Sequence, residues 1–247
     1  MKSTKKRIFA KKKFTDMIEL IDNYDKELMI LLNMGDKHTP ALDFFFWMTS
    51  EIFVWFPVLL VFLYTAISNK KKEAILVIGM VVLVFLLCDQ TSSSILKPLI
   101  ARSRPSRDPE ICGMLSYVFN YRGGLFSFPS SHACNSFGFA VFSSLLFRHP
   151  LYTATALIWA ATCAFSRIYL GVHYPGDIIC GTLLGSLIGI FCHYLYKKLD
   201  DRFFHNQSSY DLHTHTPSGF RKKDVNLIVF TLGTLFFTFA YGGLQLS

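Results

Sequence analysis

The sequence has few charged residues for its length. Of its 247 residues only 17% are charged and 51% are hydrophobic, whereas a soluble globular domain carries about 25% charged residues. Long runs without any charge recur along the chain. These runs favour a membrane protein over a soluble helical protein with an unusually apolar core.

Patterns typical of metal sites and disulfide frameworks are missing too. The six cysteines form no C-x-x-C pair, and at least four of them lie within apolar runs, so we expect them to be small packing residues. No acidic cluster suited to Mg²⁺ is present. We therefore expect neither a bound metal nor a cofactor.

An apolar segment that would mark a cleaved signal peptide does not follow the basic start. Residues 2–13 hold seven lysines and arginines, and acidic residues interrupt the chain soon afterwards. Over residues 14–34 apolar side chains alternate with these acids at helical spacing. We expect no signal peptide, and predict that residues 1–40 form a basic tail and an amphipathic helix lying on the membrane surface.

The remaining sequence predicts an all-α fold, an integral membrane helical bundle of about six transmembrane helices plus the N-terminal interfacial helix. A catalytic core of five helices is expected over 41–197, followed by a hydrophilic loop over 198–224 and a sixth transmembrane helix over 225–247. The predicted spans of the core are 41–67, 74–96, 132–147, 151–170 and 177–196.

Three short polar clusters interrupt the apolar segments, at residues 97–105, 129–132 and 166–177. The second span ends at the first cluster, and the third span begins at the second cluster. The fourth and fifth spans meet at the third cluster. If the spans cross the bilayer in turn, all three clusters lie on the same membrane face.

The clusters together contain lysine, arginine, serine and two histidines with different neighbours. Cations that hold a tetrahedral oxyanion, together with two such histidines, are what phosphoryl transfer without a metal requires. The nucleophile and the acid must be different groups, because attack and departure occur on opposite sides of phosphorus. His173, with Asp177 four residues later, is the better base, and His132, with no nearby acid, is the better proton donor.

The ordered motifs K-x6-R-P, P-S-x-H and S-R-x5-H-x3-D resemble those of the type 2 phosphatidic acid phosphatase family. That family shares its fold with bacterial non-specific acid phosphatases and vanadium haloperoxidases. The resemblance implies that His173 attacks phosphorus to form a phosphohistidine, that Asp177 orients His173, and that His132 protonates the leaving alkoxide. The phosphate-binding residues it implies are Lys97, Arg104, Ser130 and Arg167.

Four further residues are candidates around the site. Ser131 stands where the family often has glycine, so its hydroxyl either adds a phosphate donor or crowds the backbone N–H groups. Arg102 and Arg122 are candidates for headgroup contacts, although loop arginines are most often simply solvated. Asp89, inside a span, is either a functional ionisable group or a partner for polar side chains beneath the site.

The expected location is the bacterial inner membrane, with the site facing the periplasm. Cations are nearly balanced between the two faces, and discounting the arginines that serve the site places the opposite face in the cytoplasm. A site at headgroup depth suits phosphatidic acid, phosphatidylglycerol phosphate, polyprenyl pyrophosphate or the phosphates of lipid A. The size of the chain and the run over 121–132 resemble bacterial lipid A and polyprenyl-pyrophosphate phosphatases.

A transporter and a lipid phosphotransferase are the alternatives to a lipid phosphatase. A transporter favours binding sites at the membrane midplane and broken helices, whereas these clusters lie at span ends. A lipid phosphotransferase would use the same histidine chemistry with a lipid alcohol as acceptor, and the sequence does not separate it from a hydrolase. The expected partners are the bilayer and a membrane lipid substrate, with no nucleic acid, and the oligomeric state is left open.

Overall fold

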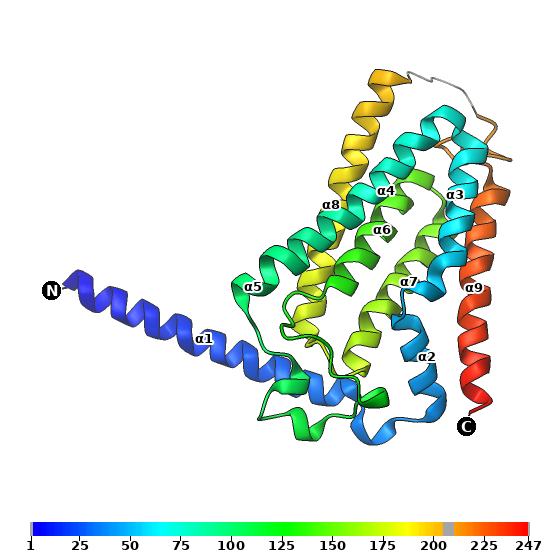
Figure 1. Ribbon diagram of the computed structural model, residues 1–247. Coiled ribbons are helices and arrows are strands. Elements are labelled where there is room, and N and C mark those ends of the chain that lie inside the picture. Colours follow the sequence, from blue (N-terminus) through cyan, green and yellow to red (C-terminus); the bar gives the residue numbers. More distant parts are fainter. Residues whose placement is uncertain (1, 205–209, 247) are drawn as a thin grey trace.

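The computed structural model describes residues 2–204 and 210–246, with side chains from residue 16 onward. Helices account for nearly all regular structure in this part of the chain, and no strand forms in it. Long helices run side by side between two ends of a bundle (Figure 1), which confirms the predicted all-α membrane fold. The helices are α1 (Lys2–Asn33), α2 (Pro40–Ser50), α3 (Phe56–Lys70), α4 (Ala74–Asp89), α5 (Lys97–Ile100), α6 (Ser131–Phe147), α7 (Pro150–Tyr169), α8 (Pro175–Phe203) and α9 (Lys222–Leu244).

Three stretches of the described chain are long and apolar enough to cross a membrane, judged by length and composition. They are Phe53–Ile100, which contains both α3 and α4, Pro175–Phe203 and Lys222–Leu244. Large apolar side chains such as Leu187 and Phe230 point outward from the bundle. In water these side chains would be poorly accommodated, whereas hydrocarbon surrounds them at little cost. That the chain crosses the membrane about six times stays a prediction.

Helix α8 packs closely along α6, because three glycines on one face of α8 meet the backbone of α6. A Cβ atom at Gly189 would lie 2.6 Å from the carbonyl oxygen of Gly138, and one at Gly185 would contact the carbonyl oxygen of Cys134 more closely still. Gly181 meets the carbonyl oxygen of Ser130 in the same way. Side chains at these positions would push the helices apart.

The predicted first span over 41–67 is wrong as a single helix, because the chain breaks between α2 and α3. The hydroxyls of Thr49 and Ser50 donate to carbonyls one turn back, and the indole of Trp55 donates to the Thr49 carbonyl at 3.2 Å. These bonds end α2, and Pro57 starts α3 in its first turn, where a proline is tolerated. The break lies at the end of the bundle that holds the polar clusters.

Two further helix boundaries differ from the sequence prediction. Helix α8 continues past Tyr196 to Phe203. Helix α4 passes through a π-helical turn, Gln90–Leu96, into the short helix α5 instead of ending at the polar run. Thr91 within this turn donates to the Leu87 carbonyl at 2.6 Å, and such turns are frequent at functional sites.

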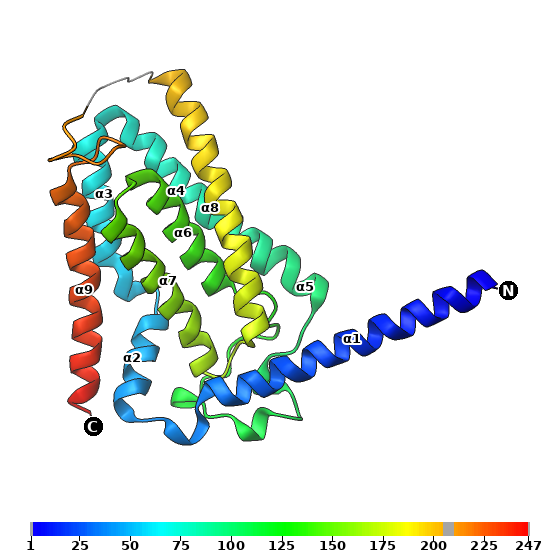
Figure 2. The same cartoon turned by 180° about the vertical axis from the view of Figure 1, so that it is seen from behind.

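Helix α1 leaves the bundle at the end where α5 lies and α8 begins, as Figures 1 and 2 show from opposite sides. It is a single helix that includes the predicted segment 14–34. Apolar side chains on it are exposed, among them Ile18, Ile21 and Leu31, as a helix on a membrane surface requires. That placement on the membrane remains a prediction, and the side chains of the basic tail lie outside the described residues.

The glycine packing between α6 and α8 makes a testable prediction about stability. Replacing glycine by alanine inside a helix ordinarily stabilises it by about 1 kcal/mol, whereas overpacking a close contact costs about 1–3 kcal/mol. We expect Gly185→Ala to lower the melting temperature in detergent. The matched control is Gly79→Ala on α4, whose added Cβ meets nothing within 4 Å. Equal melting temperatures for the two variants would contradict the packing argument.

Candidate active site

A cavity of about 430 Å³ lies among the ends of several helices, with lining residues from α2, α4, α6 and α7. Its lining brings together residues from all three polar clusters, which are far apart in the sequence. Thr49 and Ile52, from the break between α2 and α3, line it as well. The predicted residues that line it are Lys97, Arg104, Ser131, His132, Arg167, His173 and Asp89.

His173 and Asp177 form a buried pair at the start of α8. The Nδ1 atom of His173 lies 3.3 Å from Oδ2 of Asp177, which also accepts from the backbone N–H of Tyr174 at 2.9 Å. The chain reaches this position through Gly171, whose φ of +77° ends α7 in a left-handed turn. Because the carboxylate faces Nδ1, the Nε2 atom of His173 carries the lone pair on the side of the cavity.

Three cations reach the cavity without a carboxylate partner among the described residues. Arg104 donates to the carbonyl of Val172 at 2.9 Å, and Arg167 donates to the hydroxyl of Tyr121 at 3.3 Å. The Nε atoms of both arginines are buried with no hydrogen-bond partner. Lys97 donates to the Ser131 hydroxyl at 2.7 Å. Buried unpaired N–H groups are costly, and an anion in the cavity would satisfy them.

Burial and the neighbouring cations Arg104 and Arg167 hold the pKa of His173 well below its usual range. Its imidazole is therefore neutral at neutral pH, and the lone pair of Nε2 faces the guanidinium of Arg104. Burial, together with Arg167, also lowers the pKa of Arg104, to about 10. The Nη1 atom of Arg104 lies 3.3 Å from Nε2 of His173, so the two groups face the same point of the cavity.

The second cluster forms the N-terminus of α6. Ser130 is its N-cap, fully buried, and its hydroxyl accepts from the N–H of Ala133 at 3.4 Å instead of lining the cavity. Its backbone N–H donates to the carbonyl of Asp177 at 3.0 Å, which joins α6 to the start of α8. His132 lines the cavity and also a smaller hollow of about 200 Å³ beside it. The positive end of α6 faces this region.

Of the remaining candidates, Asp89 joins a polar chain on the wall of the cavity. Its carboxylate accepts from Ser93 at 3.0 Å, and the hydroxyls of Ser93 and Ser131 lie 2.8 Å apart. Ser131 thus bridges this chain to Lys97. Asp89 thus lines the cavity and also contacts a polar side chain, so both of its predicted roles stay open.

Arg102 and Arg122 do not line the cavity. The guanidinium of Arg122 stacks on Tyr117, 3.7 Å from the ring centroid. The guanidinium of Arg102 binds three carboxylates behind His173, those of Asp22, Asp25 and Asp177. Headgroup contacts by these two arginines stay a prediction.

Sequence reasoning missed several residues of the site. Tyr121 lines the cavity and bonds Arg167, yet it lies in an irregular loop where no pattern marks it. Asn135 lines the cavity from α6, and its buried Oδ1 has no partner. A polar amide one turn after His132 inside an apolar segment was the available signal. For Asp22 and Asp25 the sequence pattern indicates only the polar side of an amphipathic helix.

Fold and site together define a membrane helical bundle with a cavity lined by three cations and by the histidine of a histidine–aspartate pair. A family model described as PAP2 superfamily matches residues 73–201, and the chain belongs to this superfamily. The lipid A 4'-phosphatase of Porphyromonas gingivalis is 40% identical over 184 residues, which are 73% of this chain and 77% of that protein. That of Bacteroides thetaiotaomicron is 36% identical over 188 residues, covering 75% and 83% of the two chains.

A solved structure agrees with the same assignment. The crystal structure of LpxE from Aquifex aeolicus has a TM-score of 0.54 and 28% sequence identity, and the match covers 67% of this chain and 92% of that one. The chain is thus a bacterial membrane phosphatase of the PAP2 superfamily. The predicted family is confirmed, while the roles of the individual site residues stay predictions.

The lowered pKa of His173 predicts the pH dependence of the activity. Removing the charge of Arg104 by Arg104→Gln raises the pKa of His173 toward its ordinary value. If neutral His173 is the reacting form, the acid limb of kcat/KM then moves to higher pH. Rates on a soluble phosphate ester between about pH 4 and pH 8 test this. Arg104→Lys keeps the positive charge and should keep the limb in place, and an unmoved limb in Arg104→Gln contradicts the prediction.

Proposed function

We propose that the protein hydrolyses a phosphate monoester or a pyrophosphate of a membrane lipid, with lipid A as the first candidate and its 4'-phosphate as the group removed. The observation that carries this is the cavity itself, where three cations without carboxylate partners surround a neutral histidine held by Asp177. The two relatives named lipid A 4'-phosphatase support the choice of lipid. Phosphatidylglycerol phosphate, phosphatidic acid and polyprenyl pyrophosphate are the other candidates.

In the first step the Nε2 atom of His173 attacks phosphorus, the bond from phosphorus to the lipid oxygen breaks, and a phosphohistidine forms. His132 gives its proton to the departing alkoxide. In the second step water attacks phosphorus, the bond from phosphorus to nitrogen breaks, and inorganic phosphate leaves. His132 takes the proton of the water and is restored. Asp177 stabilises the positive charge that His173 carries during attack.

The cations neutralise the phosphoryl group while it is transferred. Arg104 and Arg167 offer planar N–H pairs to its oxygens, and Lys97 offers a mobile point charge. These groups are already in place before the substrate binds, so they need little reorganisation during the reaction. Losing one preorganised donor of this kind typically costs about 10²–10³ in rate. No metal enters this scheme.

The cavity suits a lipid better than a soluble ester, because one side of its lining is apolar and reaches the outer surface of the bundle. Ile52 is 74% exposed and Phe85 is 38% exposed, and both line the cavity with Trp55 and Trp159. A phosphate near the end of the bundle could thus enter with its hydrocarbon still in the bilayer. We propose the inner membrane as the location, with this end facing the periplasm.

The role of His173 makes the central prediction. We expect His173→Ala to release no inorganic phosphate from lipid A in detergent, because the proposed reaction passes through a phosphohistidine at this residue. His213→Ala, an exposed loop histidine far along the chain, should keep full activity. Mass spectrometry of the lipid and a phosphate assay, run on the same samples, provide the measurement.

The same assay separates a hydrolase from a lipid phosphotransferase. A hydrolase releases one inorganic phosphate for each lipid phosphate lost, whereas a transferase moves the phosphate to a second lipid alcohol. A fully active His173→Ala protein would overturn the assignment of the nucleophile. Phosphate found on another lipid in place of free phosphate would overturn hydrolysis while leaving the histidine chemistry intact.

A further inference from the structure

Helix α1 contributes to the catalytic end of the molecule, although it lies outside the stretch that matches the family. Asp25 and Asp22 on α1 bind the guanidinium of Arg102 at 2.8 Å each. The same guanidinium donates to Oδ1 of Asp177 at 3.0 Å. The second oxygen of Asp177 faces His173. One arginine therefore connects the N-terminal helix to the histidine–aspartate pair.

The contact is held from several directions. The backbone N–H of Gly176 donates to Asp25 at 2.7 Å, and a Cβ at Gly176 would lie 2.7 Å from that carboxylate, so only glycine allows this approach. Arg102 stacks on Tyr174, 3.9 Å from the ring centroid. Tyr174 and Gly176 flank the turn into α8 that carries Asp177. Asp25 thus fixes both the arginine and the backbone beside the catalytic carboxylate.

The inner half of α1 is docked firmly enough for such a role. Met29 is fully buried in a cluster with Ile168 and Tyr174. Asn33 is fully buried, and its amide donates to the carbonyl of Tyr169 at 2.8 Å and accepts from the N–H of Ser116 at 2.8 Å. These residues share one face of the helix with Asp22 and Asp25. The opposite, apolar face remains exposed.

Charge balance shows why Asp177 needs Arg102. Asp177 is fully buried, and a buried carboxylate is stable only with a close cation or several donors. Burial lowers the pKa of Arg102, but the carboxylates of Asp177 and Asp25 outweigh this and raise it, so the guanidinium is charged. Without Asp25, Arg102 would have no partner on the side of α1 except Asp22, whose side chain is 39% exposed.

We propose that Arg102 and Asp25 are positioning residues of the reaction, and that α1 completes the active site by holding Asp177 against His173. This rests on the proposed role of His173. Asp25 acts through Arg102 and through the backbone of Gly176, both of which hold Asp177, and does not line the cavity. The N-terminal helix is then a working part of the enzyme, in addition to any contact it makes with the membrane.

Kinetics of Asp25→Asn and Arg102→Gln on a soluble phosphate ester test this proposal. A misplaced catalytic group costs up to about 100-fold, so we expect kcat to fall between about 10-fold and about 100-fold, with KM nearly unchanged. Asp16→Asn, an exposed carboxylate on the same helix, is the matched control and should keep full activity. Arg102→Lys should recover part of the loss because it keeps the charge.

The coupling between the residues separates positioning from mere stability. In an Asp177→Asn background, Asp25→Asn should lower kcat no further, because the carboxylate it serves is already gone. An Asp25→Asn enzyme with normal kcat overturns the proposal, as does full additivity with Asp177→Asn. An active His173→Ala enzyme would instead overturn the proposed function, so the two failures are distinguishable.

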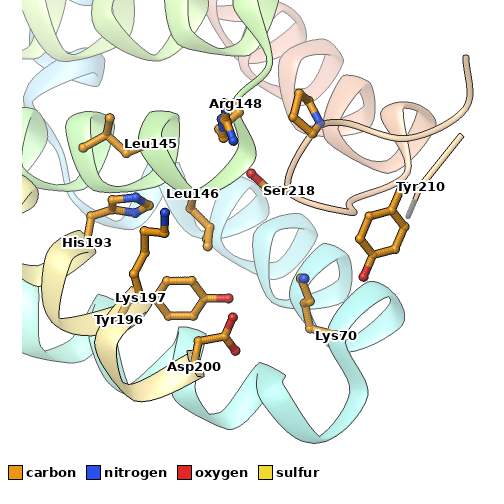
Figure 3. Close-up of a pocket in the computed structure, with 11 residues that line it drawn as sticks. Lys70, Leu145, Leu146, Arg148, His193, Tyr196, Lys197, Asp200, Tyr210 and Ser218 are labelled. Atoms are coloured by element: carbon orange, nitrogen blue, oxygen red, sulfur yellow. The ribbon is translucent and has the colours of Figure 1, made fainter. Parts of the chain in front are cut away.

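A second hollow, independent of the first, lies at the other end of the bundle. It has a volume of about 460 Å³ and is lined from the ends of α3, α6 and α8 and by the loop before α9. Figure 3 shows Lys70, Arg148 and Lys197 around it, with Ser218 beside Arg148. The lining thus carries three cations against a single carboxylate, that of Asp200.

Several of these polar groups lack partners. Among the described residues, neither Arg148 nor Lys197 makes an ion pair, whereas Lys70 lies 3.6 Å from Glu73. The Nδ1 atom of His193 and the Oδ1 atom of Asp200 are buried without a hydrogen-bond partner. Such groups are satisfied by a ligand that offers both an anion and a hydrogen-bond donor. A phosphate ester carrying a hydroxyl group has both.

We propose that this hollow binds a phosphate ester with a hydroxyl group, of the kind that a phosphatidylglycerol headgroup presents. Its phosphate would lie between Arg148 and Lys197, and its hydroxyl would donate to Asp200. Apolar side chains of α8, Leu187 and Tyr194 among them, are exposed on the surface of the bundle, where acyl chains could contact them. Lipids of the leaflet opposite the catalytic end would supply the ligand.

Melting temperatures in neutral detergent test this site. Phosphatidylglycerol should raise the melting temperature more than phosphatidylcholine does, and Arg148→Gln with Lys197→Gln should lose most of that difference. The matched control is Lys198→Gln with Arg202→Gln, which removes the same charge at the same end but outside the hollow. Lipid binding in the catalytic cavity is common to both double variants and cancels between them.

The same experiment with a water-soluble phosphate ester distinguishes a lipid headgroup from a free phosphate ester as the ligand. Glycerol 3-phosphate is added in place of the lipid. If it raises the melting temperature of the unmodified protein but not that of the Arg148→Gln, Lys197→Gln protein, the ligand of this site is a soluble phosphate ester. A shift from phosphatidylglycerol alone identifies the lipid. Equal shifts in the two double variants overturn the site. The His173→Ala protein should respond like the unmodified one, because this binding does not depend on catalysis.

Discussion

The catalytic end depends on an electrostatic imbalance that the fold maintains. Arg104, Arg167 and Lys97 meet around one cavity, and the described chain places no carboxylate in contact with any of them. Repulsion among buried cations is unfavourable, so the carbonyls and hydroxyls that accept from them stabilise the arrangement, and the phosphate of the proposed substrate would stabilise it further. The same field keeps His173 neutral.

The carboxylates of Asp177, Asp22 and Asp25 lie on the far side of His173, whereas Asp89 lies on the cavity wall and is linked to Lys97 only through Ser93 and Ser131. Asp177 faces Nδ1 of the histidine. The guanidinium of Arg102, which the acids of α1 hold in place, balances the negative charge of Asp177. Positive and negative layers therefore lie on opposite sides of one imidazole. In the proposed reaction this arrangement would direct a lone pair of the ring toward the phosphate and place a stabilising charge behind it, as a nucleophilic histidine requires.

Backbone packing sets the position of these layers. The glycine face of α8 brings its first turn against the N-terminus of α6, where Ser130 bonds the Asp177 carbonyl. Interruptions of regular helix open the cavity itself. The break after Ser50 and the π-helical turn before Lys97 direct side chains into space that straight helices would fill.

The sequence by itself determined the all-α membrane fold, the superfamily and the three clusters, because apolar runs and local motifs depend on near neighbours in the chain. It also indicated the pairing of His173 with Asp177, since residues four apart share a helix face. Only the tertiary structure decided what surrounds them. The partners of Arg102 lie more than 70 positions away, and no local pattern records a contact between distant charges. The break in 41–67 likewise depends on hydroxyls that compete with the helix, and side-chain hydrogen bonding of that kind is decided by packing.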